Sequence, residues 1–272
     1  MAIVTGAAGG IGTVITNALL ADGHAVAAID KDAAALARLV ALHEETPARE
    51  RLDPIHVDLA EADACHWVVE AVVARFGRVE AVINNAGVGM SGLRPDAETR
   101  HPTMQELSPE VWERFFAVNV RAPILLTRAA RTAMKGGWGR IINNTTSYVT
   151  MLRVLPYGAT KAALESVSAV WAKELDGTGI TVNVLVPGGP TDTPFISDGA
   201  GWPRDKMLRP AIMGPPARWL LSDESAGFTG RRITAARWDA ALPGAQAAER
   251  ASRAIGWPEL AADAVWLQTT PP

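Results

Sequence analysis

The chain has 272 residues, with 26 basic and 29 acidic side chains and a net charge of −3. Apolar residues make up 48% of it and charged residues 20%, which argues against disorder for the chain as a whole. No cluster of Lys or Arg could follow a phosphate backbone, so we expect no nucleic-acid binding. The single cysteine, Cys65, excludes an internal disulfide framework and suits a reducing cytoplasm.

The first 21 residues carry no side-chain charge, as a targeting or membrane segment would. However, no basic segment precedes them, and no uninterrupted apolar run is long enough to cross a bilayer. We therefore expect a soluble, cytoplasmic protein without a membrane contact. The segment is interrupted by Gly6, Gly9, Gly10 and Gly12.

The first apolar run, Ala2 to Thr5, predicts a strand that leads into this glycine cluster. Helical spacing begins with Ile11, and Gly23 ends the helix. Glycines at such a junction let the backbone turn tightly and approach a pyrophosphate, while the helix N-terminus offers free N–H groups to the anion. Turns need glycine anyway, but this position favours a nucleotide site.

Asp30 closes the second apolar run, 25–29, and follows Gly12 by 18 residues. A carboxylate there can accept hydrogen bonds from a ribose 2′-hydroxyl and would repel a 2′-phosphate, which favours NAD over NADP. The alternative role for Asp30 is to cap the next helix. NADP stays open, because Lys31 could neutralise a phosphate, whereas Ala8 gives the glycine loop no basic side chain.

Further apolar runs continue the alternation of strands and helices. Residues 55–57 predict a third strand closed by Asp58, and residues 79–83 a fourth that enters Asn84-Asn85-Ala86-Gly87. Ser108-Pro109-Glu110 predicts a helix start, with Ser as the cap and Pro at the first position. The remaining elements are strands over 140–143 and 180–186 and a long helix over 157–175.

Continuously apolar strands that alternate with helices predict a parallel sheet covered by helices on both faces. No internal repeat or low-complexity tract interrupts the pattern. We therefore predict a single doubly wound α/β domain of the Rossmann type over residues 1–240, followed by a C-terminal extension over residues 241–272.

Five motifs in this order resemble the short-chain dehydrogenase/reductase family and span about residues 2–235. The resemblance implies a nicotinamide cofactor, hydride transfer between that cofactor and an alcohol or carbonyl carbon, and a homodimer or homotetramer. The motifs are Thr5-Gly6-x-x-x-Gly10-Ile11-Gly12, Asn84-Asn85-Ala86-Gly87, Asn119, Tyr157-x-x-x-Lys161 and Pro187-Gly188.

The same resemblance implies roles for single residues. Asp58 would contact adenine, Lys161 would hydrogen-bond the nicotinamide ribose, and Asn119 would hold a water beside that lysine through the backbone of its helix. The full set of implied cofactor contacts is Gly6, Gly10, Ile11, Gly12, Asp30, Asp58, Leu59, Asn85, Ala86, Gly87, Tyr157, Lys161, Pro187, Gly188, Pro190, Thr191 and Thr193.

The Tyr157–Lys161 pair supports the same chemistry from elementary considerations. Residues four apart share one helix face, so both side chains can point into one cleft. A phenol titrates near ~10 in water, and a nearby ammonium, together with an oxidised nicotinamide, favours the phenolate. Tyr157 could then exchange a proton with an alcohol or carbonyl oxygen. An accidental Tyr–Lys spacing on an amphipathic helix is the alternative interpretation.

The serine that the family uses after strand five has no single equivalent here. In the run Asn143-Asn144-Thr145-Thr146-Ser147, the register of that serine falls on Thr146, whereas Ser147 preserves the residue type. Either hydroxyl could stabilise charge on a carbonyl oxygen, and the other would be a turn residue. Thr191 and Thr193 likewise flank the position, Asp192, where the family commonly places a threonine that bonds the nicotinamide carboxamide.

Two stretches are longer than the family leads us to expect. The polar insertion 88–108 could overhang the cleft, and residues 194–216 occupy the place of the family's mobile substrate lid. Arg204 and Arg209 weaken the case for an apolar substrate. That case rests on the apolar lid residues Trp202, Met207, Leu208 and Met213.

The C-terminal extension contains Trp257 and Trp266, which need apolar cover. We expect the amphipathic run 259–267 to pack on another subunit or on the cleft. The histidines show no metal-ligand spacing, so we predict no metal.

The sequence therefore predicts an NAD(H)-dependent oxidoreductase that interconverts a secondary alcohol and a ketone or aldehyde. Tyr157 is the expected acid–base, with Lys161, Asn119, and Thr146 or Ser147 completing the site. The alternatives are a non-catalytic dinucleotide sensor, an epimerase or dehydratase of related fold, and an enoyl reductase. Retention of the Tyr–Lys pair argues against the first, the lack of a larger C-terminal domain against the second, and the Tyr–Lys spacing against the third.

Overall fold

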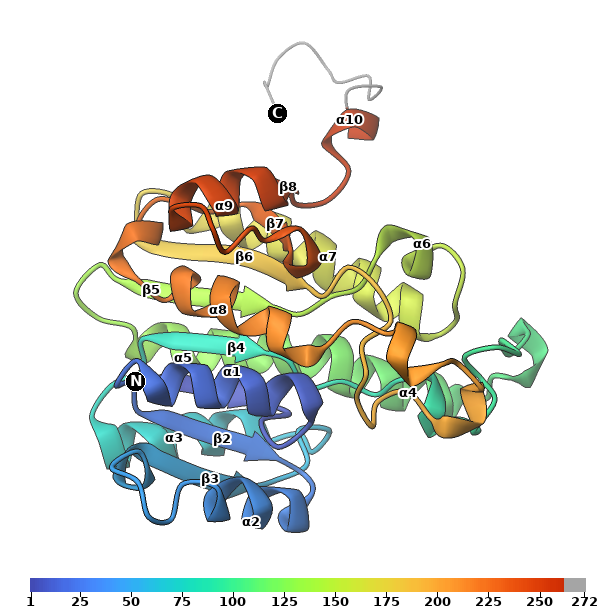
Figure 1. Cartoon of the computed structure of the whole chain (residues 1–272), viewed down its shortest axis with the longest axis horizontal. Helices are drawn as coiled ribbons and strands as arrows, with labels where there is room; N and C mark the ends of the chain where they lie inside the picture. The colour runs from blue at the N-terminus through green and yellow to red at the C-terminus, as the bar shows by residue number, and fades with distance from the viewer. Residues whose placement is uncertain (262–272) are drawn as a thin grey trace.

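An eight-stranded sheet runs through the molecule, and the structure, a computed structural model, describes residues 1–261 (Figure 1). The strand order is β3-β2-β1-β4-β5-β6-β7-β8, and every neighbouring pair is parallel except β7 and β8. The strands are β1 (Ala2–Thr5), β2 (Val26–Asp30), β3 (Leu52–His56), β4 (Ala81–Asn84), β5 (Gly139–Asn143), β6 (Ile180–Val186), β7 (Arg231–Thr234) and β8 (Ser252–Ala254).

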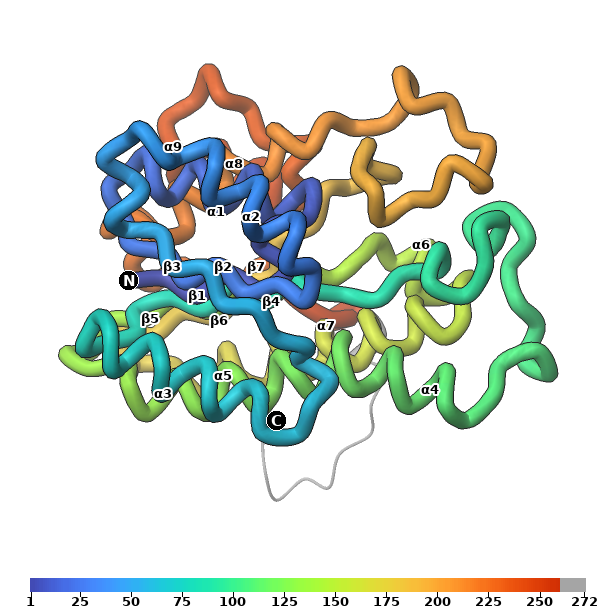
Figure 2. The backbone as a smooth tube through the Cα atoms, turned by 90° about the horizontal axis from the view of Figure 1, so that it is seen from below, coloured from blue at the N-terminus to red at the C-terminus, as the bar shows by residue number. Residues whose placement is uncertain are grey.

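Helices cover both faces of the sheet (Figure 2). One face carries α1 (Gly10–Ala21), α2 (Ala33–Ala41), α8 (Gly214–Leu220) and α9 (Gly244–Ala251). The other carries α3 (Ala64–Phe76), α5 (Ala122–Ala133) and α7 (Tyr157–Glu174). The remaining helices are α4 (Pro109–Phe116), the π-helical segment η4 (Ala117–Arg121), α6 (Tyr148–Met151) and α10 (Pro258–Ala261). Short 3-10 helices cover Arg49–Arg51, Met90–Gly92, Met104–Glu106, Asp198–Ala200, Arg204–Lys206, Pro210–Met213, Asp223–Ser225 and Ala235–Arg237.

The central strands β1, β4 and β6 are mostly apolar because both of their faces are buried. In β1, Val4 packs with the α1 and α8 side of the core and Ile3 with the α3 and α5 side, as the two-residue period of a strand requires. All seven residues of β6 are buried. The prediction of a doubly wound parallel α/β sheet is confirmed.

The predicted element boundaries agree with the structure to within two residues, except at β3. That strand begins at Leu52, three residues before the predicted start at Ile55, because Asp53 and Pro54 break the apolar pattern. Proline is tolerated here because β3 is an edge strand of the sheet.

The sequence analysis does not predict β7 or β8, and the sheet runs past residue 240 into the predicted extension. β7 contains two arginines, so its sequence does not look like a buried strand. Arg232 is nevertheless only 6% exposed, because it pairs with Glu165. β8 is a three-residue edge strand. The proposed covering role of residues 241–272 stays a prediction, and Trp266 and part of the run 259–267 lie outside the described residues.

Within residues 1–261, no helix combines the length and the apolar character needed to cross a membrane.

Candidate active site

A cleft of about 760 Å³ opens where the central strands end. The strand order reverses between β1 and β4, and open α/β sheets bind ligands at the carboxyl ends of the strands at such a point. Residues one or two positions after the ends of β1 to β6 line this cleft, so the fold itself gathers them. They include Gly6, Lys31, Asp58, Asn85, Asn144 and Pro187.

The glycine loop is shaped so that backbone, and not side chains, faces the cleft. Gly6 has φ +61, a conformation that favours glycine, and a Cβ on Gly12 would overlap the Gly6 carbonyl oxygen. Gly9 precedes α1 without a side-chain cap, so the first N–H groups of the helix are available to a ligand. The loop therefore fits a diphosphate, which needs close backbone approach and free N–H donors.

Thr5 and Asn85 fix this loop to the loop after β4. The Asn85 side-chain amide donates to the carbonyl oxygens of Thr5 at 3.0 Å and Gly6 at 3.2 Å. The Thr5 hydroxyl oxygen accepts from the backbone N–H groups of Asn85 and Ala86, each at 3.0 Å. Because these bonds saturate Asn85 locally, the residue shapes the cleft floor that Ala86 and Gly87 continue.

Asp30 faces the same cleft from the end of β2, with both carboxylate oxygens held by backbone. The N–H of Ala8 donates to Oδ2 at 3.0 Å, and the N–H of Asp32 donates to Oδ1 at 3.1 Å. The alternative role for Asp30 as a helix cap is wrong, because Asp32 caps α2 by accepting from the Ala35 N–H at 2.9 Å.

Asp58 and Leu59 line the cleft next to Asp30. The Asp58 carboxylate accepts from Arg114 Nη2 at 2.8 Å and from the Ala60 N–H at 2.9 Å. Burial raises the pKa of Asp58, but these hydrogen bonds outweigh burial and hold the pKa below its usual value. Arg114 comes from α4, and nothing in the sequence motifs predicts its contact with Asp58.

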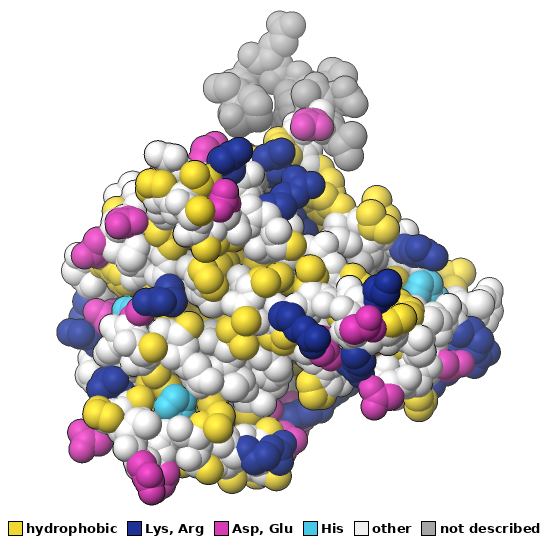
Figure 3. All heavy atoms as spheres, viewed as in Figure 1, with side chains coloured by type: hydrophobic (Ala, Val, Ile, Leu, Met, Phe, Trp, Pro, Cys, Tyr) yellow, Lys and Arg dark blue, Asp and Glu magenta, His cyan; other side chains and the backbone are white. Residues whose placement is uncertain are grey.

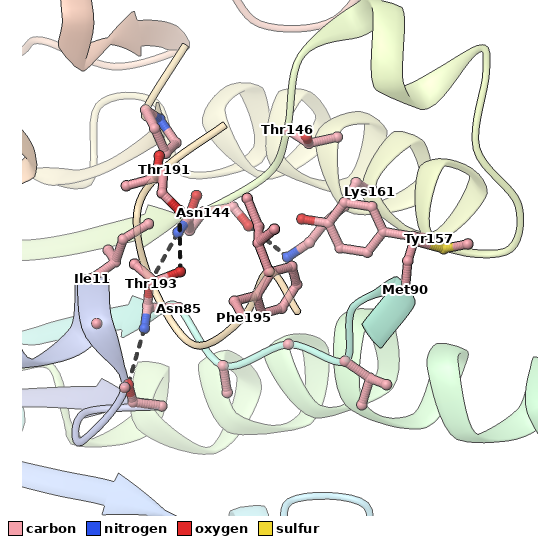
Figure 4. A pocket seen from close by; sticks show the side chains of 18 of the residues that line it. Ile11, Asn85, Met90, Asn144, Thr146, Tyr157, Lys161, Thr191, Thr193 and Phe195 are labelled. Carbon is pink, nitrogen blue, oxygen red and sulfur yellow. Dashed lines mark hydrogen bonds between the residues drawn. The ribbon is translucent and has the colours of Figure 1, made fainter. Parts of the chain in front are cut away.

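Tyr157 is the first residue of α7, and Lys161 lies one turn later, so both point into the cleft (Figure 4). Lys161 Nζ donates to the Asn144 carbonyl oxygen at 2.8 Å and lies 5.7 Å from the centre of the Tyr157 ring. Burial raises the pKa of Tyr157 to about 12 and lowers that of Lys161 to about 8. In the chain alone the phenol is therefore less acidic than expected, because loss of water outweighs the effect of the Thr146 hydroxyl.

The two candidate hydroxyl groups have different surroundings. Thr146 lines the cleft together with Tyr157, and its hydroxyl acts to lower the pKa of that phenol. Ser147 is the N-cap of α6: its Oγ accepts from the Thr150 N–H at 3.1 Å and lies 2.9 Å from the Thr150 hydroxyl. Ser147 also lines the cleft, but its hydroxyl is engaged in starting α6.

Asn119 is wholly buried in η4, the π-helical segment that joins α4 and α5. Its Oδ1 accepts from the Val88 N–H at 2.8 Å, and its Nδ2 donates to Val88 O at 3.1 Å and to Thr160 Oγ1 at 3.0 Å. The side chain thus ties the loop after β4 to α7. A π-helical turn interrupts the regular backbone pattern, and such turns recur at functional sites.

Thr191 and Thr193 are both buried and both line the cleft, together with Pro187, Gly188 and Pro190. The Thr193 side chain packs against Gly10 so closely that a Cβ there would overlap it. Thr191 Oγ1 donates to the Gly189 carbonyl oxygen at 3.1 Å. Of the two threonines, Thr193 therefore touches the glycine loop.

A model of the short chain dehydrogenase family matches residues 1–200. A short-chain type dehydrogenase/reductase from Picea abies is 35% identical over 242 residues, covering 82% of this chain and 86% of that protein. The chain belongs to the short-chain dehydrogenase/reductase family. The resemblance inferred from the motifs is thereby confirmed.

Further similar proteins agree with this family. The (3R)-3-hydroxyacyl-CoA dehydrogenase of Rattus norvegicus is 32% identical over 251 residues, covering 86% of this chain and 93% of that protein. A solved structure of a blue fluorescent protein from a metagenomic library, in complex with NADPH, superposes with a TM-score of 0.70 and 28% identity, covering 82% of this chain and 91% of that chain. As a short-chain dehydrogenase/reductase, the protein is an oxidoreductase acting on CH–OH groups with a nicotinamide dinucleotide.

Several residues of this short-chain dehydrogenase site do not stand out in the sequence. The Phe195 ring lies 5.8 Å from the Tyr157 ring, centre to centre, and fills the space beside Gly89. Gly89 in the insertion and Phe195 in the lid belong to no sequence motif, so their contact could not be predicted. Apolar residues from the insertion, from α6 and the segment after it, and from the lid line the cleft: Met90, Val149, Val154, Phe195, Ile196 and Trp202.

Fewer apolar side chains of the lid reach the cleft than the sequence led us to expect. Of its four apolar candidates only Trp202 lines the cleft, because Met207 packs within the lid and Met213 joins the main core. Its arginines turn to acidic neighbours: Arg204 pairs with Asp198 at 2.6 Å and Arg209 with Asp192 at 2.6 Å. Figure 3 shows basic and acidic side chains next to each other over this region.

Proposed function

We propose that the protein is an NAD(H)-dependent oxidoreductase that interconverts a secondary alcohol and a ketone or aldehyde. The observation that carries this proposal is that Tyr157, Lys161 and Thr146 line the same cleft as the glycine loop. A sensor that only binds a dinucleotide would have no need of a buried Tyr–Lys pair, whose burial shifts both pKa values unfavourably.

The preference for NAD is supported by Asp30. Its carboxylate is held toward the cleft by two backbone N–H groups, in the position where an acid can bond a ribose 2′-hydroxyl and repel a 2′-phosphate. Lys31 also lines the cleft, and a structural neighbour carries NADPH, so NADP is the competing cofactor. The fixed negative charge favours NAD.

The cofactor halves would be held by different parts of the cleft. Gly6, Gly10, Ile11 and Gly12 would hold the diphosphate, and Asp30, Asp58 and Leu59 the adenosine. Asn85, Ala86, Gly87, Lys161, Pro187, Gly188, Pro190, Thr191 and Thr193 would surround the nicotinamide half. When bound, the nicotinamide ring supplies or accepts the hydride of the reaction.

The chain's own residues would handle the substrate oxygen and its proton. Tyr157 Oη donates a proton to the carbonyl oxygen in reduction and takes the hydroxyl proton in oxidation. The Thr146 hydroxyl hydrogen-bonds the same oxygen and stabilises the charge that develops there. Lys161, held by the Asn144 carbonyl, supplies positive charge beside the phenol. Asn119 keeps α7 in register with the loop after β4.

The substrate end of the cleft supports an apolar compound. Phe195, Met90, Val154 and Trp202 line it, and the lid arginines that argued against an apolar substrate are engaged with acidic residues outside it. Apolar walls with a few polar groups at the reacting atom are typical of sites for small apolar molecules.

We further propose a homodimer or homotetramer. Support comes from aromatic side chains left on the α3 and α4 surface: Trp67 is 50% exposed and Phe116 is 39% exposed. Phe116 packs against Trp112 at 6.1 Å between ring centres. Exposed apolar side chains that lie together, as Trp112 and Phe116 do, mark protein contacts when they form a contiguous patch.

The proposal is tested by turnover with NAD and NADP against a panel of secondary alcohols and ketones, together with Tyr157→Phe. We expect turnover with NAD to be lost by at least ~100-fold in the variant, because general acid–base catalysis contributes about 10²–10⁴-fold. NAD binding, measured by tryptophan fluorescence, should be retained. Unchanged turnover in Tyr157→Phe would refute the assigned acid–base.

A further inference from the structure

A buried ion pair lies directly behind the proposed active site. Glu165, on α7 two turns after Tyr157, is wholly buried, and Arg232 on β7 is 6% exposed. Arg232 Nη1 donates to Glu165 Oε2 at 2.6 Å. A buried ion pair is weak evidence for stability, because removing two charges from water offsets their attraction. Its other contacts therefore decide what it does.

The guanidinium of Arg232 is directed at two consecutive residues of the loop between β5 and α6. Nη1 also donates to Thr145 Oγ1 at 2.9 Å, and Nη2 donates to the Thr146 carbonyl oxygen. The Thr145 hydroxyl in turn donates to Glu165 Oε2 at 2.7 Å. A planar guanidinium can satisfy two acceptors in fixed geometry, whereas an ammonium is a point charge.

Glu165 and the ring of Tyr148 hold the guanidinium in place. Tyr148 Oη lies 3.2 Å from Glu165 Oε1 and donates to the Gly256 carbonyl oxygen at 2.8 Å. Its ring centre lies 4.4 Å from the Arg232 guanidinium carbon, a cation–π contact. The Gly256 N–H is 3.4 Å from Glu165 Oε1. Both oxygens of Glu165 are thus engaged, which leaves the guanidinium little freedom to move.

The residue that Arg232 holds lines the same cleft as Tyr157, so its hydroxyl and the phenol face one site. A threonine is β-branched and has few accessible χ1 rotamers, so the position of its backbone decides where its Oγ lies. Fixing the Thr146 carbonyl oxygen therefore also fixes the direction of the Thr146 hydroxyl.

We propose that Arg232 is a positioning residue for the reaction, which aims the Thr146 hydroxyl by holding the Thr146 carbonyl oxygen, with Glu165 as the anchor of its guanidinium. This inference rests on the proposed function and goes beyond it, because Arg232 touches neither substrate nor cofactor. The competing interpretation is that the pair only fastens β7 to α7.

The test is Arg232→Lys, with Arg231→Lys as its matched control. A lysine can keep the charge opposite Glu165 but cannot also reach the Thr146 carbonyl oxygen. We expect kcat to fall by about 30-fold, since small misplacements of reacting groups cost up to about 100-fold, while KM and the Kd for NAD change by less than about 2-fold. Arg231 binds Ser252 and Glu249 on the other side of β7, so its variant should keep kcat.

A double-mutant cycle with Thr146→Val separates positioning from fastening. If Arg232 acts through the Thr146 hydroxyl, Arg232→Lys should lower kcat by less than about 2-fold in the Thr146→Val background, because no hydroxyl remains to be aimed. Equal fold-losses in both backgrounds, or no loss in Arg232→Lys alone, would overturn the inference.

Circular dichroism and NAD binding report whether each variant folds. If Arg232→Lys fails to fold, Glu165→Gln takes its place in the double-mutant cycle with Thr146→Val, and the same criteria apply. This substitution weakens the anchor of the guanidinium and keeps the side-chain shape. Failure of the proposed function can be told apart from failure of the positioning role. An unmodified protein without nicotinamide-dependent turnover would overturn both the proposed function and the positioning role. An active protein that tolerates Arg232→Lys would overturn only the positioning role.

Discussion

At the scale of single residues, the neighbouring acids Asp30 and Asp32 have different roles. Asp32 caps α2 and leaves Asp30 free to face the cleft. We expect Asp30→Ala to lower kcat/KM for NAD by about 10–100-fold, since a hydrogen bond to a charged group contributes about 1.5–3 kcal/mol. Turnover with NADP should rise at the same time, because a repelling charge is removed.

Initial rates with both cofactors measure this change. Asp32→Ala is the matched control: it should lower stability by about 1 kcal/mol through loss of the helix cap, yet leave the ratio of NAD to NADP turnover unchanged. An unaltered ratio in Asp30→Ala would contradict the assignment of Asp30 to the ribose.

Thr146 and Ser147 are adjacent hydroxyl residues with separate expected effects. Thr146→Val should lower kcat by about 10²–10³-fold, as loss of one donor to a developing oxyanion does. Ser147→Ala should cost about 1 kcal/mol of stability through the α6 cap and leave kcat within a few-fold. Steady-state kinetics and thermal unfolding of both variants check this. The reverse pattern would transfer the role to Ser147.

The motif residues could be predicted from sequence because their chemistry is tied to local spacing, as Tyr157 and Lys161 share one helix face. The proposal of Thr146 over Ser147 could not be made from sequence, because it depends on where the Ser147 hydroxyl finds its partner, Thr150. Arg114 and Arg232 were missed for a similar reason. Each meets its partner only after distant elements pack together, Arg114 with Asp58 and Arg232 with Glu165.

At the scale of elements, the insertion and the lid meet across the mouth of the cleft. Ser91 Oγ donates to the Phe195 carbonyl oxygen at 2.9 Å, and the Phe195 ring fills the space beside Gly89. This contact places the ring next to Tyr157. The position of the lid therefore depends on a glycine in the other segment.

We expect Gly89→Ala to lower kcat/KM for the substrate by about 5–100-fold, because the new Cβ overlaps the Phe195 ring and overpacking costs about 1–3 kcal/mol. In a Phe195→Leu background, which frees that space, Gly89→Ala should change kcat/KM by less than about 2-fold. Steady-state kinetics of the four proteins measure the coupling. An equal loss in both backgrounds would show that Gly89 acts independently of Phe195.

At the scale of the whole molecule, the central sheet follows from its apolar strands, whereas its far edge does not. β1, β2, β4, β5 and β6 are predicted because both faces of each strand are covered, which leaves a mostly apolar run. β3 is predicted only in part, because Asp53 and Pro54 interrupt its apolar pattern. β7 escapes prediction because Arg232 is buried by pairing, and β8 because two of its three residues are exposed. Gly256, just beyond β8, also contacts the ion pair behind Thr146, so this edge reaches the site.

The last strand and helix should therefore be part of the folding unit. α9 buries Ala247, Ala248 and Ala251, and the following segment buries Ile255. The test compares the Tm of a chain that ends at residue 240 with that of a chain that ends at residue 261. The difference in Tm then reports the segment that contains α9, β8 and α10. Loss of this burial and of the β7–β8 hydrogen bonds should lower Tm by more than about 10 °C, at about 2–4 °C per kcal/mol for a domain of this size. Equal Tm values and equal kcat in the two chains, measured by calorimetry and turnover, would show that the sheet is complete without its antiparallel edge.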